Sequence, residues 1–210
     1  MITKEKWNEL VSKWEKIGKV YQTPKRSIER LTHFCETCLP YLKDKRVLEI
    51  GANAGIFGYC ISQVAENYTA VEPANKVRDP SKKKPSQTDY FKQLEITSQS
   101  MQNAKIFNET ISEYCKHPED SNAFVACFAL YHFMDKELKA LDELVIPCCD
   151  TVIIQNRNQK RPTPHNKYKF WKSKNVVKYF EARGFKLEKM IPSSKKDGSQ
   201  LFDEIILIRA

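Results

Sequence analysis

The stretch from Val47 to Gly58 constrains the fold more than any other part of the chain, because an apolar run ends in an acid and then enters a glycine-containing turn. It reads VLEIGANAGIFG. Gly51 and Gly55 carry no side chain, so the backbone can adopt positive φ and its amides can approach a ligand closely. Asn53 suits the same turn, since Asn tolerates the left-handed region better than most residues. The pattern predicts a strand, a tight turn and a helix N-terminus of the kind that binds nucleotides.

A second apolar run ends in Glu72, about 20 residues beyond the turn, where a carboxylate can accept hydrogen bonds from both hydroxyls of a ribose. Turn and acid together predict a site for an adenosine-containing cofactor. The spacing differs from the G-x-G-x-x-G of dinucleotide folds, and no G-K-[S/T] follows to make a phosphate loop. An ordinary strand, turn and helix of another α/β protein is the alternative interpretation.

The E-x-G-A-N-x-G form of this turn resembles the first motif of class I S-adenosylmethionine-dependent methyltransferases, whose usual form is E/D-x-G-x-G-x-G. The resemblance implies S-adenosylmethionine (SAM) as cofactor and S-adenosylhomocysteine (SAH) as product. It implies that the acid after the second strand, with its neighbour, lies at the ribose: Glu72 and Pro73. It also implies that the methionine part of the cofactor lies against the turn: Glu49, Gly51, Ala52, Asn53 and Gly55.

Strand-like and helix-like segments alternate from residue 45 onwards. We expect strands at 46–50, 68–72, 104–108, 123–129, 150–155, 184–191 and 203–209, with helices at 56–65, 88–100, 135–145 and 173–183. Such alternation builds a largely parallel sheet with helices on both faces. The last two strands read as a β-hairpin, and a terminal antiparallel strand is typical of the methyltransferase sheet. We therefore expect an α/β protein with a three-layer Rossmann-like methyltransferase fold, whose seven-stranded, mostly parallel sheet has an antiparallel C-terminal strand.

Two helical patterns, 4–17 and 27–42, come before this alternation. We expect residues 1–44 to form a helical cap and residues 45–210 the Rossmann-like core, together a single methyltransferase domain over 1–210. Trp7 and Trp14 recur at helical spacing on the first of these helices. They are expected to pack against the core rather than to line a ligand site.

Residues after the third and fourth strands complete the expected site, because ligands bind at the carboxyl ends of strands in open α/β sheets. By resemblance, adenine is recognised after the third strand by Glu109, Thr110 and Ile111, although the family usually has Asp and a small residue here. Phe128, at the end of the fourth strand, is also expected at the cofactor.

Tyr131 and His132 are the expected catalytic residues, since either could orient or deprotonate a methyl acceptor at the exit of the fourth strand. A structural role at the strand exit is the alternative for His132. Asn122 stands where many small-molecule methyltransferases have an acid, so no carboxylate is expected there. The segment also lacks the N/D-P-P-Y/F tetrapeptide of exocyclic-amine DNA methylation.

Basic residues gather in two segments, 76–86 and 155–172, within a chain of formal net charge +9. The second interleaves basic and aromatic residues, a pattern that could bind phosphates and stack on unpaired bases. From it we expect four substrate contacts: Asn156, Arg157, His165 and Tyr168. A solvated loop anchored by its aromatic residues would show the same composition, and an anionic small molecule would satisfy the same charges.

Seven cysteines and no apolar segment of about 18 residues favour a cytoplasmic protein with reduced thiols and no membrane association. Cys35 and Cys38 lack a second cysteine pair of matching spacing, so we expect no metal site. The expected function is SAM-dependent methyl transfer to an anionic or phosphorylated small molecule or to RNA. Two alternatives remain open, a catalytically inactive SAM-binding protein and a nucleic-acid-binding protein on the same fold.

Overall fold

The seven predicted strands form one sheet in the computed structural model, which describes residues 2–16, 24–73, 90–130, 133–157, 170, 172–192 and 202–210. Their order across the sheet is β3-β2-β1-β4-β5-β7-β6. The bounds are β1 Arg46–Ile50, β2 Asn67–Val71, β3 Ala104–Phe107, β4 Ala123–Cys127, β5 Thr151–Arg157, β6 Phe185–Pro192 and β7 Phe202–Arg209. β1 to β5 pair in parallel, and β7 runs antiparallel to both β5 and β6. The expected sheet and its antiparallel C-terminal strand are confirmed.

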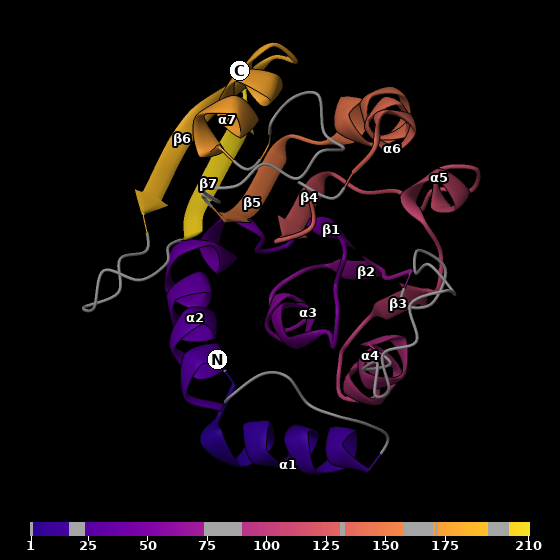
Figure 1. Cartoon of the computed structure of the whole chain (residues 1–210), viewed down its shortest axis with the longest axis vertical. Coiled ribbons are helices and arrows are strands. Elements are labelled where there is room, and N and C mark those ends of the chain that lie inside the picture. Colours follow the sequence, from indigo (N-terminus) through magenta and orange to yellow (C-terminus); the bar gives the residue numbers. More distant parts are fainter. Residues whose placement is uncertain are drawn as a thin grey trace, which may run out of the picture.

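Helices cover both faces of the sheet, so the fold has three layers (Figure 1). One face carries α1 Lys4–Glu15, α2 Pro24–Thr37, α3 Ile56–Ile61 and α4 Tyr90–Ser98. The other carries α5 Ile111–Tyr114, α6 Asp135–Ala140 and α7 Ser173–Glu181. Alternate residues of the central strands enter two separate hydrophobic clusters, one on each face. No helix within the described ranges combines the length and apolar character needed to cross a bilayer.

Local chemistry explains where several elements differ from the expected bounds. The helix predicted over 27–42 begins earlier, at Pro24, and ends at Thr37, and Pro40 then supports a 3₁₀ turn over Leu39–Tyr41. The helix predicted over 135–145 is α6 followed by a π-helical turn at Leu141–Val145. β4 ends at Cys127 rather than at 129, because Phe128 has φ of 59° and leaves the strand conformation.

Helix α1 packs onto the core through its tryptophans, as predicted. Thr3 caps it by accepting a hydrogen bond from the Lys6 amide (3.1 Å). Trp7 and Trp14 are fully buried, with ring centroids 6.0 Å apart in an edge-on arrangement. The Trp14 indole N–H lies 3.2 Å from both the Gln93 carbonyl and Thr97 Oγ1 on α4. The first helix is therefore tied to the layer that carries the glycine turn.

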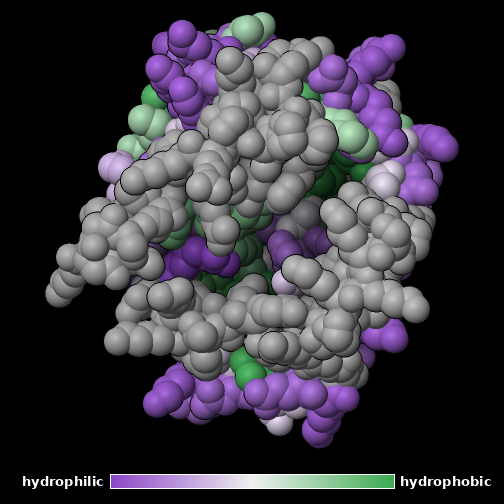
Figure 2. Space-filling view, viewed as in Figure 1, coloured by the Kyte–Doolittle hydropathy of each residue, from purple (hydrophilic) through white to green (hydrophobic). Residues whose placement is uncertain are grey.

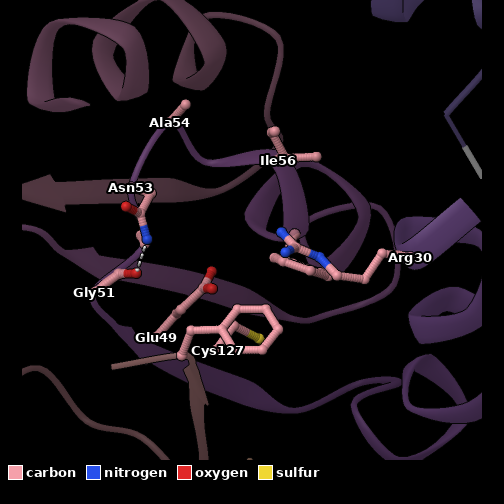
Figure 3. Close-up of a pocket in the computed structure, with 10 residues that line it drawn as sticks. Arg30, Glu49, Gly51, Asn53, Ala54, Ile56 and Cys127 are labelled. Carbon is pink, nitrogen blue, oxygen red and sulfur yellow. Dashed lines mark hydrogen bonds between the residues drawn. The ribbon is translucent and has the colours of Figure 1, made fainter. Parts of the chain in front are cut away.

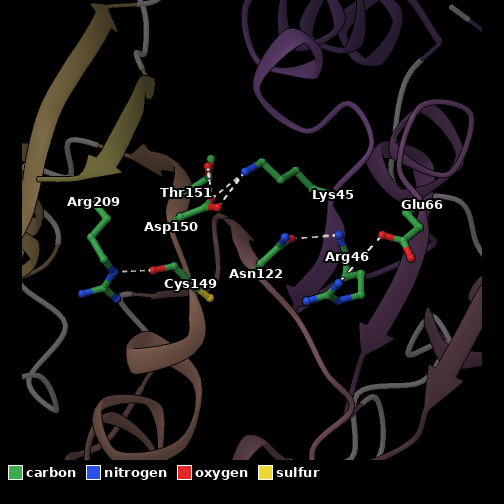
Figure 4. Close-up of polar contacts among 8 residues, drawn as sticks. All are labelled: Lys45, Arg46, Glu66, Asn122, Cys149, Asp150, Thr151 and Arg209. Atoms are coloured by element: carbon green, nitrogen blue, oxygen red, sulfur yellow. Dashed lines mark hydrogen bonds and ion pairs between the residues drawn. The ribbon is translucent and has the colours of Figure 1, made fainter.

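Polar contacts join the amino ends of the central strands (Figure 4). Lys45 Nζ reaches both oxygens of Asp150 at 2.8 and 2.7 Å, and Asn122 Oδ1 accepts from the Arg46 amide at 2.9 Å. Asn122 stands where many small-molecule methyltransferases have an acid. Here it links β4 to β1 at the amino ends of the strands, opposite to the end that carries the glycine turn.

Replacing Asp150 with asparagine is expected to lower the free energy of unfolding by up to about 1 kcal/mol at pH 7, because this ion pair is half-exposed. Burial opposes ionisation of Asp150, but hydrogen bonds from Lys45 and Thr151 outweigh it and lower the pKa of the carboxyl. The stabilisation is therefore present above the ordinary pKa of aspartate and is lost as the pH falls through the lowered value. Urea unfolding at about pH 7 and pH 3 measures it; a difference between wild type and variant that grows at low pH contradicts this account.

Candidate functional site

The turn between β1 and α3 is built from three residues in the left-handed region. Gly51, Asn53 and Gly55 have φ of 75°, 51° and 75°. The Gly51 amide donates to the Val71 carbonyl at 2.8 Å, and Asn53 Nδ2 donates to the Gly51 carbonyl at 2.9 Å (Figure 3). Gly55 is also the N-cap of α3. The sequence pattern is thus confirmed as a strand, a tight turn and a helix start.

Close packing requires glycine in the turn as much as its backbone angles do. A Cβ on Gly51 would lie 2.5 Å from the Ala129 Cβ, and one on Gly55 would lie 2.6 Å from Leu94 Cδ1. The turn is also supported from α4, where Thr97 Oγ1 lies 2.7 Å from the Ala54 carbonyl. The N-terminal helix, α4 and the turn therefore form one packed unit.

A pocket opens between this turn, α2 and the end of β4. Its lining consists of Arg30, Glu49, Gly51, Ala52, Asn53, Ala54, Ile56, Phe57, Cys127 and Phe128 (Figure 3). In the orientation of Figure 1 the molecular surface is hollowed near its centre, where hydrophilic and hydrophobic residues meet (Figure 2). The pocket is open to the surface, and its accessible volume is about 20 Å³, enough for at least one water molecule.

Glu49 lies in the pocket and is 1% exposed. One carboxylate oxygen, Oε2, accepts a hydrogen bond from the Tyr68 hydroxyl at 2.6 Å. The other, Oε1, is buried with no hydrogen-bond partner among the described residues. Burial raises the pKa of this carboxyl to about 8, with a smaller contribution from nearby Glu72 and against the effect of Tyr68. A buried acceptor without a donor is suited to a cationic or N–H-bearing ligand group.

Glu72 lies beside the same turn, directly after β2. Its Oε2 accepts a hydrogen bond from the Asn53 amide at 2.8 Å, and its own amide donates to the Phe107 carbonyl at 3.0 Å. Glu72 is 8% exposed. Two carboxylates, one at the end of β1 and one after β2, thus flank a single turn, as the spacing predicted. Pro73 follows at the edge of the described segment.

No family model and no curated protein matches the chain. Solved structures do match its fold. Magnesium protoporphyrin IX methyltransferase (ChlM) from Synechocystis PCC 6803 aligns with a TM-score of 0.62 and 11% identity, over 95% of this chain and 91% of that one. The N-methyltransferase NodS from Bradyrhizobium japonicum WM9 aligns with a TM-score of 0.62 and 11% identity, over 89% and 97%. A candidate RNA methyltransferase from Pyrococcus horikoshii aligns with a TM-score of 0.57 and 14% identity, over 91% and 87%.

The chain has the class I methyltransferase fold. Within this methyltransferase fold the turn and both acids stand at the carboxyl ends of β1 and β2, the edge where open α/β sheets bind ligands.

Aromatic and cationic groups complete the pocket of this methyltransferase fold. Phe128 lines it, and its φ of 59° is unusual for a bulky residue. Its expected contact with the cofactor stays a prediction. The Arg30 guanidinium lies 4.7 Å from the Phe128 ring centroid and 5.1 Å from that of Phe57. Sequence reasoning missed Arg30. The helical pattern identifies α2, but it does not show that one turn of α2 reaches the end of β4.

The residues that were expected to recognise adenine make contacts within the protein itself. Thr110 caps α5 through a capping box with Glu113, and Ile111 is buried in the core cluster on the opposite face from the pocket. Glu109 Oε2 lies 3.2 Å from His117 Nε2. None of Glu109, Thr110 and Ile111 lines the pocket. Their assignment to adenine stays a prediction.

Most of the residues that were expected on the acceptor side lie outside the part of the chain that the structure describes. Asn156 is fully buried, and its Nδ2 lies 3.1 Å from Ser173 Oγ at the start of α7. Arg157 ends β5, and nothing is described of its side chain. The remaining expected contacts and catalytic residues lie outside the described residues: Tyr131, His132, His165 and Tyr168. So do the basic segments, 76–86 completely and 155–172 for the most part.

Proposed function

We propose that this protein is a SAM-dependent methyltransferase whose cofactor binds in the pocket at the β1–α3 turn. The single observation that carries the proposal is the unpartnered Oε1 of Glu49, buried in a pocket whose turn also binds Glu72. An amino-acid ammonium group would supply the missing donor to Glu49. The SAM and SAH bound in structures of the ChlM and NodS neighbours support the same cofactor.

The residues present fit the parts of that cofactor. Glu49 suits the methionine ammonium, the backbone of the turn suits close approach of the methionine chain, and Glu72 suits the ribose hydroxyls. Bound SAM supplies a methyl group already activated by its sulfonium. The protein then needs chiefly to align an acceptor and, where required, to take up its proton.

The acceptor is proposed to be an anionic small molecule or RNA. The basic segments support both, and the fold neighbours include a porphyrin methyltransferase and a candidate RNA methyltransferase. Incubation with SAM labelled in its methyl group, a metabolite extract and total RNA tests this directly. Label that enters one of the two pools with wild-type protein, and not with the Glu72→Ala variant, supports methyl transfer. Cofactor binding without label in either pool would favour the inactive alternative, which the methyltransferase neighbours do not support.

The Glu72→Ala variant is expected to bind SAM at least about 10-fold more weakly than wild type. It loses the ribose acceptor and the partner of the Asn53 amide, and each hydrogen bond to a charged group contributes about 1.5–3 kcal/mol. Isothermal titration calorimetry measures the loss. Glu66→Gln, at a half-exposed acid near Arg46 away from the pocket, is the matched control. Unchanged affinity in Glu72→Ala would remove Glu72 from the site.

A further inference from the structure

A second group of buried polar side chains lies beside the cofactor pocket, under α2. Its centre is Glu204 on β7, which is fully buried. Glu204 Oε1 accepts a hydrogen bond from Gln155 Nε2 at 2.7 Å, and Oε2 lies 2.5 Å from Thr37 Oγ1, whose single proton is shared between this oxygen and the His33 carbonyl at 2.7 Å. A buried carboxylate is costly unless donors surround it, so this site is built to hold one.

His33 makes the third contact with this carboxylate, one helical turn before Thr37. Its Nε2 lies 3.2 Å from Glu204 Oε2, within ion-pair distance, although the two atoms do not have hydrogen-bond geometry in this structure. The His33 side chain is 34% exposed, whereas the Glu204 side chain is inaccessible. The imidazole therefore connects a buried carboxylate to the surface.

Two sets of contacts connect the His33–Glu204 pair to residues that line the pocket. Cys127 lines the pocket and is the register partner of Gln155 on the neighbouring strand β5. Gln155 is in turn the register partner of Glu204 on β7, so the backbones of Cys127 and Glu204 are two strand spacings of about 4.8 Å apart. The Phe128 ring, also in the pocket, is 5.7 Å from that of Phe202, which is 6.5 Å from the imidazole of His33. One aromatic ring, that of Phe202, therefore stands between the His33 imidazole and the pocket residue Phe128.

Polar and charged side chains of α2, β4, β5 and β6 surround the pair. Gln155 Oε1 is buried and has no hydrogen-bond partner among the described residues, so it could receive a donor from a ligand. The other charged or titratable groups described nearby are Arg30, Cys35 and Glu36 on α2, Cys38 just after it, Cys127 on β4 and Lys189 on β6. Of these groups, Arg30 and Cys127 also line the pocket.

We propose that His33 is the base on the acceptor side of this methyl-transfer site and that Glu204 is the residue that positions it. The inference rests on the proposed function. Glu204 holds the proton on Nε2, which leaves Nδ1 to accept one, the same division of roles between carboxylate and imidazole as in a Ser-His-Asp triad.

The proposed step defines the class of acceptor. The acceptor oxygen or nitrogen bonds to the methyl carbon while the carbon–sulfur bond breaks and its electron pair stays on sulfur. The proton of the acceptor passes to Nδ1 of His33 and leaves later to water. The acceptor is therefore a hydroxyl or amine that has a proton to lose, since a group without one needs no base.

Imidazole nitrogen NMR tests the pair without any acceptor. The chain has 4 histidines, and His33→Gln identifies the signals of His33 by removing them. At about pH 8.5, where an ordinary imidazole is neutral, we expect wild-type His33 to carry its proton on Nε2 and Glu204→Gln to give a mixture of tautomers. A proton on Nδ1 in wild type, or no change in Glu204→Gln, overturns the proposal.

The rate at which the labelled methyl group of SAM enters the accepting pool, metabolites or RNA, tests the catalytic role of His33. His33→Gln is expected to lower the initial rate by about 100-fold, with the dissociation constant for SAH changed less than about threefold. Glu204→Gln should lower the rate by about 10-fold and shift its pH profile, whereas Glu143→Gln, an exposed acid on the far face, should change neither.

The two proposals fail in different ways. Transfer at the wild-type rate by His33→Gln, with His132→Gln inactive, would overturn the role of His33 and leave the methyltransferase function intact. Failure of wild type to bind SAM or SAH would overturn the proposed function, and the NMR result would still decide whether Glu204 orients His33.

Discussion

Gly51→Ala is expected to weaken SAM binding by at least about 100-fold and to lower the free energy of unfolding by about 1–3 kcal/mol. The new Cβ would lie 2.5 Å from the Ala129 Cβ, on a residue whose φ is 75°. Relief of the clash requires the turn to move away from the residues that follow β4. The Gly51 amide would then leave the Val71 carbonyl, and the turn would no longer fit the cofactor.

Gly184→Ala separates strain from steric clash. Gly184 has φ of 81°, but a Cβ there would meet only Arg209 Nη1, at 3.8 Å, before the edge strand β6. In this control the free energy of unfolding should fall by the part of the Gly51→Ala effect that comes from positive φ alone. Its affinity for SAM should equal that of wild type. Thermal denaturation and calorimetry of both variants provide the comparison. Normal SAM affinity in Gly51→Ala would show that the turn does not form the cofactor site.

Glu49→Gln is expected to weaken SAM binding by about 10- to 100-fold and to abolish its dependence on pH. With a pKa of about 8, the Glu49 carboxyl of the free protein is largely protonated below neutral pH. An ammonium group bound at Oε1 favours the ionised form, so binding releases a proton. Wild-type affinity should therefore rise by up to about tenfold per unit between about pH 5.5 and 7, below the ordinary pKa of an α-amino group.

Calorimetry in two buffers of different ionisation enthalpy measures the protons released on binding. Wild type should release close to one proton at about pH 6, and Glu49→Gln should release fewer. Glu95→Gln, at an exposed acid of α4, should behave as wild type does. Equal proton release from wild type and Glu49→Gln would exclude Glu49 as the group that meets the ammonium.

The same pKa makes the stability of the ligand-free protein depend on pH. Folding raises the pKa of Glu49 from an ordinary value of 4.5 to about 8, so the folded state binds more protons between these values. The contribution of Glu49 to stability is complete below about pH 4.5, falls as the pH rises and levels off above about 8. Glu49→Gln should flatten this slope in urea unfolding measured across that range.

The sheet and the turn could be predicted because they depend on local pattern. Buried parallel strands read as apolar runs, and a turn with positive φ needs Gly or Asn, so Gly51, Asn53 and Gly55 identify it. Glu72 followed from its distance along the chain, which the βαβ unit keeps nearly constant.

Contacts between distant elements could not be predicted in the same way. His33 and Glu204 are 171 residues apart, and only the antiparallel pairing of β7 with β5 brings them together under α2. Helix α5 was missed because a single turn of four residues carries too little periodicity to detect. The contact of Asn156 with α7 could not be predicted either, because strand alternation places its side chain against Ser173 while that of Gln155 faces α2. Its expected contact with substrate stays a prediction.

Titration of SAM into the wild-type protein is the most direct test of the proposed cofactor site. The account predicts one binding site of micromolar affinity, competition by SAH, and loss of both in Gly51→Ala while Gly184→Ala keeps them. Absence of binding to wild type at millimolar SAM would contradict it, and the fold would then serve a different ligand.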